Sequence, residues 1–220
     1  MKTALLFGAT GLVGSHLLNL LIINNNYSKI KVFVRSSIEL NDPKIEIIQT
    51  DFNNLKNHRE DIKGDDCFFC IGTTKKNSPD KNEYKRVELE VPKQVAQIAK
   101  SNLVNSFVFV SSGYADPKSS GDYLKFKGLV EEELKRLNFS KLGIMRPSFL
   151  LGNRQEKRVG EKIGIFVFKL LSPLFLGPLK KMKPIHSATV AKAMIRTANE
   201  KLEKKVFESN EIAELVLNQT

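Results

Sequence analysis

Hydrophobic and polar positions divide this chain into two alternating kinds of segment. Short apolar runs, typical of buried strands, are separated by longer segments in which apolar residues recur every three or four positions, as on one face of a helix. The predicted strands cover residues 3–7, 29–35, 44–50, 65–72, 106–112 and 141–148, and the predicted helices cover 14–23, 82–101 and 122–137. This alternation predicts an α/β fold, a doubly wound parallel sheet with helices on both faces.

The pattern loosens after residue 148. We predict a helix and turn over 160–175, a helix over 187–200, a short strand over 204–209 and a last helix over 210–218. We expect residues 1–220 to form a single domain, in which 150–220 contribute a small C-terminal cap on the substrate side. Pro92 lies inside the predicted helix 82–101 and should strain or break it.

Composition fits a globular protein, with 41% hydrophobic and 27% charged residues in a chain of 220. No apolar run approaches the about 18 residues of a membrane span, and the start MKTALLFGATG lacks the features of a signal peptide, so we expect a cytoplasmic protein. The net charge of +11 favours anions. Its basic residues are spread along the chain, with short clusters at 154–158 and 179–183, which indicates a solvated basic face and no specific nucleic-acid partner.

Two cysteines have the C-x-x-C spacing of some metal and redox sites. Cys67 and Cys70 lie in the predicted strand DDCFFCIG, where side chains three positions apart point to opposite faces. We therefore interpret them as a reduced, structural pair and expect no metal site.

Three glycines connect the first predicted strand to the first helix. Gly8, Gly11 and Gly14 form the pattern G-x-x-G-x-x-G, which suits a tight turn, a close approach to a pyrophosphate and close packing of helix on strand. Free N–H groups at the helix start would face the anion. In this strand-turn-helix frame the motif predicts a Rossmann-type dinucleotide site, with Thr10, Leu12 and Val13 also at the cofactor.

Residues that follow the other strands extend the predicted cofactor site. Arg35, followed by Ser36 and Ser37, stands where an acidic residue would bind the ribose of NAD, and its planar fork suits a 2′-phosphate, so we expect NADP(H) rather than NAD(H). Asp51 and Phe52 follow the third strand and could hold the adenine. The residues expected beneath the dinucleotide at the end of the fourth strand are Cys70, Ile71, Gly72 and Thr73.

Several motifs together resemble the short-chain dehydrogenase/reductase superfamily. They are the glycine turn, the strand FVFVSS and the Tyr-x-x-x-Lys spacing of Tyr123 and Lys127. CIGTT, YLKFKGLVEEEL and MRPSFLLG are similar to the small atypical members related to the HIV Tat-interacting protein. The resemblance covers residues 1–150 well and the remainder loosely.

The resemblance implies catalytic roles for three residues. Tyr123 would be the general acid/base, and Lys127, one helical turn later, would lower its pKa and hold the nicotinamide ribose. Ser112 would orient the substrate oxygen, with Ser111 as an alternate. The nicotinamide end would be lined by Pro147, Ser148 and Phe149.

The chain also departs from the family pattern. Helix 82–101 has no asparagine for the proton relay that some members use. In Ile-His-Ser-Ala-Thr-Val-Ala (185–191), Thr189 replaces an aspartate but could still cap a helix, and His186 is interpreted as structural. His16 and His58 have no predicted partner.

Two functions follow from these features. The first is an NADP-dependent oxidoreductase that transfers hydride between nicotinamide and a small or apolar carbonyl or alcohol, since the C-terminal segment IGIFVFKLLSPLFLGPL favours a compact apolar pocket. The second is a catalytically weak NADP(H)-binding regulator that engages a protein partner. The same apolar segment could instead form the contact of a homodimer.

Overall fold

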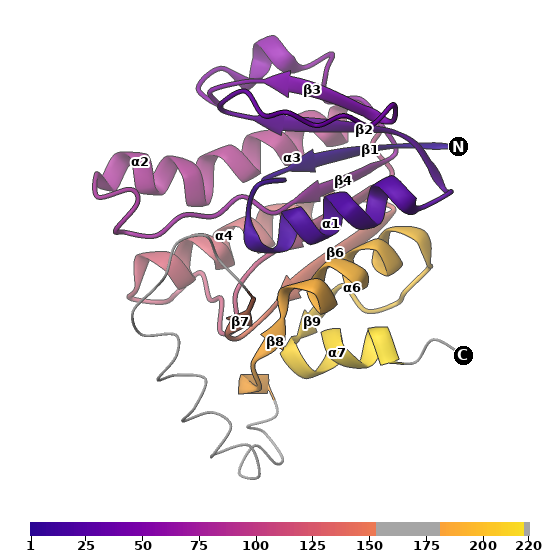
Figure 1. Cartoon of the computed structure of the whole chain (residues 1–220). Helices are drawn as coiled ribbons and strands as arrows, with labels where there is room; N and C mark the ends of the chain where they lie inside the picture. Colours follow the sequence, from indigo (N-terminus) through magenta and orange to yellow (C-terminus); the bar gives the residue numbers. More distant parts are fainter. Residues whose placement is uncertain (153–180, 218–220) are drawn as a thin grey trace.

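The computed structural model describes residues 1–152 and 181–217. In this part of the chain, seven parallel strands form one sheet in the order β3-β2-β1-β4-β5-β6-β9, and β7 and β8 form a separate parallel pair (Figure 1). The strands are β1 (Lys2–Phe7), β2 (Tyr27–Val34), β3 (Ile45–Gln49), β4 (Asp66–Phe69), β5 (Ser106–Val110), β6 (Lys141–Arg146), β7 (Leu150–Leu151), β8 (Ile185–His186) and β9 (Val206–Glu208).

Helices cover both faces of the sheet. Helices α1, α6 and α7 lie on one face, and α3 and α4 lie on the other (Figure 1). The helical segments are α1 (Leu12–Ile23), η1 (Leu55–His58), α2 (Lys81–Lys85), η2 (Arg86–Glu90), α3 (Val91–Ser101), α4 (Asp122–Leu137), α6 (Ser187–Asn199) and α7 (Ser209–Leu217). The doubly wound α/β fold expected from the sequence is confirmed. Among the helices of the described residues, none is long and apolar enough to cross a bilayer.

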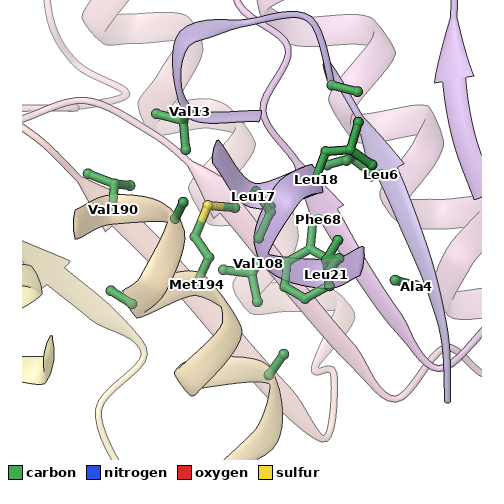
Figure 2. Close-up of a cluster of buried hydrophobic side chains, with 14 of the residues drawn as sticks. Ala4, Leu6, Val13, Leu17, Leu18, Leu21, Phe68, Val108, Val190 and Met194 are labelled. Atoms are coloured by element: carbon green, nitrogen blue, oxygen red, sulfur yellow. The ribbon is translucent and has the colours of Figure 1, made fainter. Parts of the chain in front are cut away.

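Each strand supplies two hydrophobic cores because its side chains alternate between the faces. In β1, Ala4 and Leu6 enter the core beneath α1, whereas Leu5 and Phe7 enter the core beneath α3 and α4. Figure 2 shows the first of these, the α1-face core, in which residues of α1, β1, β4, β5 and α6 meet. Met194 of α6 reaches Val108 and Leu17 there, so the two ends of the chain share one core.

A buried polar network lies at the end of the sheet opposite the glycine turn. Asp66, the first residue of β4, is completely buried. Its carboxylate accepts hydrogen bonds from Lys2 Nζ (2.9 Å), the Tyr27 hydroxyl (2.8 Å) and the Ser106 hydroxyl (2.7 Å). Burial, together with the nearby Asp66 carboxylate, raises the pKa of Tyr27, so its phenol remains a donor. The network joins β1, β2, β4 and β5.

Element ends differ from the sequence prediction where the chain approaches the glycine turn. Strand β4 ends at Phe69, not at Gly72, and β5 ends at Val110, because the following residues leave the sheet to form loops at its carboxyl edge. The predicted helix 82–101 is divided into α2, the π-helical turn η2 and α3. Pro92 lies in the first turn of α3, so the predicted break occurs just before it.

The C-terminal region completes the main domain rather than only forming a cap. Strand β9 pairs with β6 in the large sheet, and α6 packs against α1. Buried residues of α6, β9 and α7 belong to the α1-face core, and the contribution of 150–220 to a substrate-side cap stays a prediction. The helix and turn predicted over 160–175 lie outside the described residues.

Candidate active site

The glycine turn adopts the geometry that its sequence predicts. Gly8 has φ +87°, and a Cβ there would lie 2.8 Å from the Cys70 carbonyl carbon. A Cβ on Gly14 would lie only 2.0 Å from the Gly8 carbonyl oxygen. The Gly11 N–H donates to that same oxygen at 3.0 Å. Helix α1 therefore begins directly against the end of β1, which only glycine at positions 8 and 14 permits.

The start of α1 is open to an anion. Gly11 is the N-cap residue, and no side chain caps the helix. The first N–H groups of a helix have no intrahelical partner, and the helix dipole is positive there. The Val13 side chain points into the α1-face core (Figure 2), so Leu12 and Val13 can offer only backbone groups to a phosphate.

A pocket of about 310 Å³ lies next to this turn, where the loops after β1, β2 and β4 meet. Since the chain leaves β1 for β2 on one side and reaches β4 on the other, this is the switch point at which open α/β sheets bind ligands. Residues predicted at the cofactor that line the pocket are Gly8, Thr10, Gly11, Arg35, Ser36, Phe52, Cys70, Ile71, Gly72 and Thr73.

Two arginines line the pocket. Arg35 follows β2 and is exposed, and within the described residues its guanidinium has no hydrogen bond or ion pair. Arg86, from η2, forms a bidentate ion pair with Glu83 at 2.7 and 2.8 Å. Its remaining Nη1 is buried without a hydrogen-bond partner in the described part of the chain. The pocket is therefore lined by one guanidinium without a partner in the described residues, that of Arg35, and by a second, that of Arg86, whose charge is balanced by Glu83.

Asp51 and Phe52 separate in the structure. Phe52 is buried, lines the pocket and holds φ +62°, a strained backbone conformation for a bulky residue. The Asp51 carboxylate instead accepts hydrogen bonds from the backbone and side chain of Asn53, at 2.9 and 2.8 Å. These bonds, the backbone bond first, lower the pKa of Asp51. Its carboxylate is therefore turned to its own loop rather than to the pocket.

Tyr123 and Lys127 share one face of α4. Tyr123 is 38% exposed, whereas Lys127 is only 3% exposed. The ammonium of Lys127 lies 5.9 Å from the centroid of the Tyr123 ring and 4.9 Å from that of Phe109. A Cβ built on Gly72, which lines the pocket, would lie 3.9 Å from Lys127 Nζ, so this lysine is close to the pocket wall. Neither Tyr123 nor Lys127 is among the residues that line this pocket in the described part of the chain, but Lys127 lies close to its lining residue Gly72.

The two serines at the end of β5 have different surroundings. Ser111 is buried and donates to Glu131 Oε1 at 2.6 Å. The same carboxylate accepts two bonds from Arg146, at 2.8 and 2.6 Å. Ser112 is partly exposed, and its hydroxyl has only a 3.3 Å bond to the Gly113 carbonyl. The Ser111 hydroxyl therefore hydrogen-bonds in the interior, whereas Ser112 is partly exposed, and the roles of both serines stay predictions.

Residues 147–149 connect β6 to β7 beside the β5–α4 loop. The Pro147 carbonyl accepts from the Gly113 N–H at 2.8 Å, which fixes this segment next to Ser112. Ser148 donates to the Lys183 carbonyl at 2.7 Å, and the Phe149 side chain is 56% exposed. None of the three lines the pocket formed by the described residues, so their place at the nicotinamide end stays a prediction.

The cysteines and histidines of the described residues form no catalytic or metal-binding cluster at this site. Cys67 belongs to the core beneath α3 and α4, whereas Cys70 packs on the α1-face core, so the opposite orientations predicted for them are confirmed. Burial raises the pKa of Cys70 to about 12. His58 does have a partner, Asp61, at 2.9 Å. Within the described residues no three His, Cys, Asp or Glu side chains gather as metal ligands.

The predicted cap on α6 is not formed. His186 is its N-cap residue, and among the described residues no side chain, that of Thr189 included, makes a capping hydrogen bond there.

Sequence reasoning missed two residues of η2. Arg86 lines the pocket, and Glu88, which is completely buried, forms an ion pair with Lys127 at 3.0 Å. A signal was available in the sequence, because a buried lysine needs a nearby carboxylate. The chain offers several acidic residues, however, and spacing alone does not identify the one that contacts a residue 39 positions away.

Comparison with protein families and curated proteins extends this picture. Residues 8–201 match a family model described as NAD(P)H-binding. The chain is 30% identical to "Protein FMP52-1, mitochondrial" of Scheffersomyces stipitis, over 97% of this chain and 98% of that protein. It is 32% identical to HTATIP2 of Rattus norvegicus, over 73% of this chain and 67% of that protein. The resemblance to atypical short-chain dehydrogenases/reductases is confirmed.

The names of the fungal relatives correct one expectation. FMP52 proteins of Scheffersomyces stipitis, Debaryomyces hansenii and Candida glabrata are all named mitochondrial, which contradicts the cytoplasmic location expected from the sequence. Net composition and the lack of a long apolar run carry no information that separates these two compartments.

Solved structures of low sequence identity share the fold. WbmH of Bordetella bronchiseptica in complex with NAD+ has a TM-score of 0.70 at 17% identity, covering 94% of this chain and 75% of that one. A UDP-N-acetylglucosamine 4-epimerase from Methanobrevibacter ruminantium has a TM-score of 0.68 at 19% identity, covering 93% and 74%. Both support the Rossmann-type assignment.

Proposed function

Because the chain belongs to the NAD(P)H-binding family, we propose that it is an NADP-dependent oxidoreductase that acts on a small or apolar carbonyl or alcohol. The observation that carries this proposal is the short connection from the pocket to α4. Thr73 lines the pocket and its N–H donates to Glu88, which forms an ion pair with Lys127. The Lys127 ammonium lies 5.9 Å from the centroid of the Tyr123 ring. A dinucleotide in the pocket would therefore end beside an accessible phenol with a cation next to it.

The glycine-lined pocket fits a dinucleotide. The uncapped start of α1 offers N–H groups to a pyrophosphate, and Gly8 and Gly11 leave room for it to approach. Arg35 would bind the 2′-phosphate that distinguishes NADP from NAD, and Arg86, with its unpartnered Nη1, adds a second cation at the same mouth. A bound nicotinamide would supply the hydride chemistry.

Three side chains would then bind the substrate oxygen and transfer its proton. Tyr123 donates a proton to it in reduction and accepts one in oxidation. Lys127 stabilises the phenolate, because a positive charge nearby favours the ionised form of the phenol. Ser112 donates a hydrogen bond to the same oxygen. The expectation of a small or apolar substrate rests on the apolar sequence IGIFVFKLLSPLFLGPL at 163–179.

The cofactor preference can be tested by fluorescence titration with NADPH and NADH. We expect Arg35→Ala to weaken NADPH binding by about 10- to 100-fold, the value of a charge-assisted hydrogen bond, and to leave NADH binding unchanged. Arg59→Ala, which removes an arginine outside the pocket, is the matched control and should change neither. Equal losses for NADPH and NADH in Arg35→Ala would refute the 2′-phosphate role.

A further inference from the structure

Glu88 links the two parts of the candidate site. Its carboxylate is completely buried, with Oε2 at 3.0 Å from Lys127 Nζ and Oε1 accepting a 2.5 Å hydrogen bond from the Thr73 N–H. Thr73 belongs to the loop that lines the pocket, and Lys127 belongs to α4. One side chain therefore connects the floor of the pocket to the catalytic helix.

The local sequence explains why Glu88 points inward. Pro92 has no N–H, so the α-helical hydrogen bond to the carbonyl four residues earlier, that of Glu88, cannot form. The chain instead makes the π-helical turn Arg86–Glu90 between α2 and α3. A π turn inserts an extra residue and re-aims the side chains within it, and such turns are frequent at functional sites.

Lys127 is otherwise surrounded by groups that do not carry a negative charge. Its Nζ lies 3.4 Å from the Val110 carbonyl and between the rings of Phe109 and Tyr123. Within the described residues, Glu88 is the carboxylate in ion-pair contact with it. We propose that Glu88 is a positioning residue for the reaction proposed above, and that it holds Lys127 as an ammonium beneath the Tyr123 ring.

Other titratable groups around the pair do not take over this role. From α2, Tyr84 faces the site, and burial raises its pKa to about 12. Cys70, at the end of β4, also has its pKa raised to about 12 by burial. Both are neutral near pH 7. On α4, Asp122 is half exposed and pairs with Lys75 at 3.3 Å.

The charge of Lys127 depends on a balance between burial and this carboxylate. Burial is the largest single effect on Lys127 and favours the neutral amine, but the charge of Glu88, the interaction with Tyr123 and the hydrogen bond to Glu88 together outweigh burial and leave the pKa of Lys127 raised. Without the carboxylate, burial prevails, and lysines buried in apolar surroundings can lose their proton near neutral pH. Neutral Lys127 could no longer stabilise the phenolate of Tyr123.

The first test is the pH profile of NADPH-dependent carbonyl reduction in Glu88→Gln. We expect the pH at which the rate falls on the alkaline side to move down by about one unit or more, because Lys127 loses its proton earlier. Glu88→Asp keeps the charge and should retain the wild-type profile with a lower kcat, since the ammonium is displaced. Glu90→Gln, at an exposed neighbouring pair with Lys85, is the matched control.

A second test needs no turnover. The raised pKa of wild-type Lys127 gives stability that is lost only as pH rises through that pKa, above the ordinary value of 10.5. In Glu88→Gln the folded-state pKa falls below 10.5, so the free energy of unfolding should increase with pH between about pH 7 and 9, where wild type gains none from this residue. The double variant Glu88→Gln/Lys127→Met should lose that slope.

The outcomes separate the two proposals. Unchanged pH profiles and unfolding slopes in Glu88→Gln would overturn the role of Glu88. If Glu88→Gln does not fold at neutral pH, a folded double variant supports the charge argument, and a double variant that also fails to fold overturns it. If wild type binds no NADPH or reduces no carbonyl, the oxidoreductase proposal fails, while the unfolding series still decides the role of Glu88.

Discussion

Gly14→Ala is the sharpest test of the glycine turn, because the structure gives the clash directly. The new methyl group would lie 2.0 Å from the Gly8 carbonyl oxygen and 2.8 Å from its carbon, both backbone atoms that cannot rotate away. Helix α1 must therefore move off β1. Overpacking of this kind costs about 1–3 kcal/mol, and we expect the upper end of that range since the contact is with backbone.

The matched variant is Gly11→Ala. There the methyl group would lie 3.3 Å from the nearest atom, the Gly8 oxygen, and Gly11 has φ −78°, which alanine adopts freely. We expect little change in stability, but weaker NADPH binding, because the methyl group occupies the side of the turn that the phosphates approach. The two glycines should thus separate folding from binding.

Two measurements distinguish these variants. Thermal unfolding of Gly14→Ala should show a Tm lower by about 6–12 °C, as a loss of about 3 kcal/mol implies for a domain of this size, and NADPH binding should weaken as well. Gly11→Ala should keep its Tm within about 2 °C and lose only binding. Wild-type Tm and NADPH affinity in Gly14→Ala would refute the packing of α1 against the turn.

Three further changes test other parts of the molecule. Tyr123→Phe should abolish turnover and leave NADPH affinity nearly unchanged in the fluorescence titration, and retained activity would move the proton donor elsewhere. Asp66→Asn should cost about 3 kcal/mol in urea unfolding, because three donors lose a buried charged acceptor, whereas Glu46→Gln, in an exposed pair, should stay within about 0.5 kcal/mol. The hydrogen bond from Arg136 lowers the pKa of Glu133 in the folded state. The ionised carboxylate therefore adds to the free energy of unfolding above the ordinary pKa of 4.5, and this stability is lost as pH falls through the lower pKa of the folded state. Glu133→Gln should reduce the dependence of the free energy of unfolding on pH in that window, and an unchanged midpoint of acid unfolding would contradict this.

The sequence predicts the fold well because its signals are local. Apolar runs and helical periodicity identify β1, α1 and α4, and the helix predicted over 122–137 has the observed bounds. The glycine turn was also predictable, because its glycines are spaced three residues apart and a Cβ on Gly14 would meet the backbone of Gly8, only six positions earlier. The C-terminal ends of β4 and β5 were not predictable from the sequence. Each strand ends where the chain turns away from the sheet, and the position of that turn depends on contacts with residues far away in sequence.

Side-chain partners in the site were predicted less completely. Tyr123 and Lys127 share a helix, so their spacing is enough to place them together. Glu88, in the π-helical turn before Pro92, contacts Lys127 of α4, and Ser111 hydrogen-bonds with Glu131, which pairs with Arg146 of β6. These are tertiary contacts, and no single segment encodes them. The roles of the site residues stay predictions until the variants above are measured.

The two cores have consequences for the order in which the chain can fold during its synthesis. The core beneath α3 and α4 draws its buried members from residues 5–144, so it can close once the ribosome has released the first two thirds of the chain. The α1-face core cannot close then, because Val190, Met194 and Phe207 are still missing. Until translation is nearly finished, the apolar residues of α1 and of the sheet beneath it therefore lack the cover of α6 and α7. During that interval the nascent chain exposes apolar surface that a chaperone could bind.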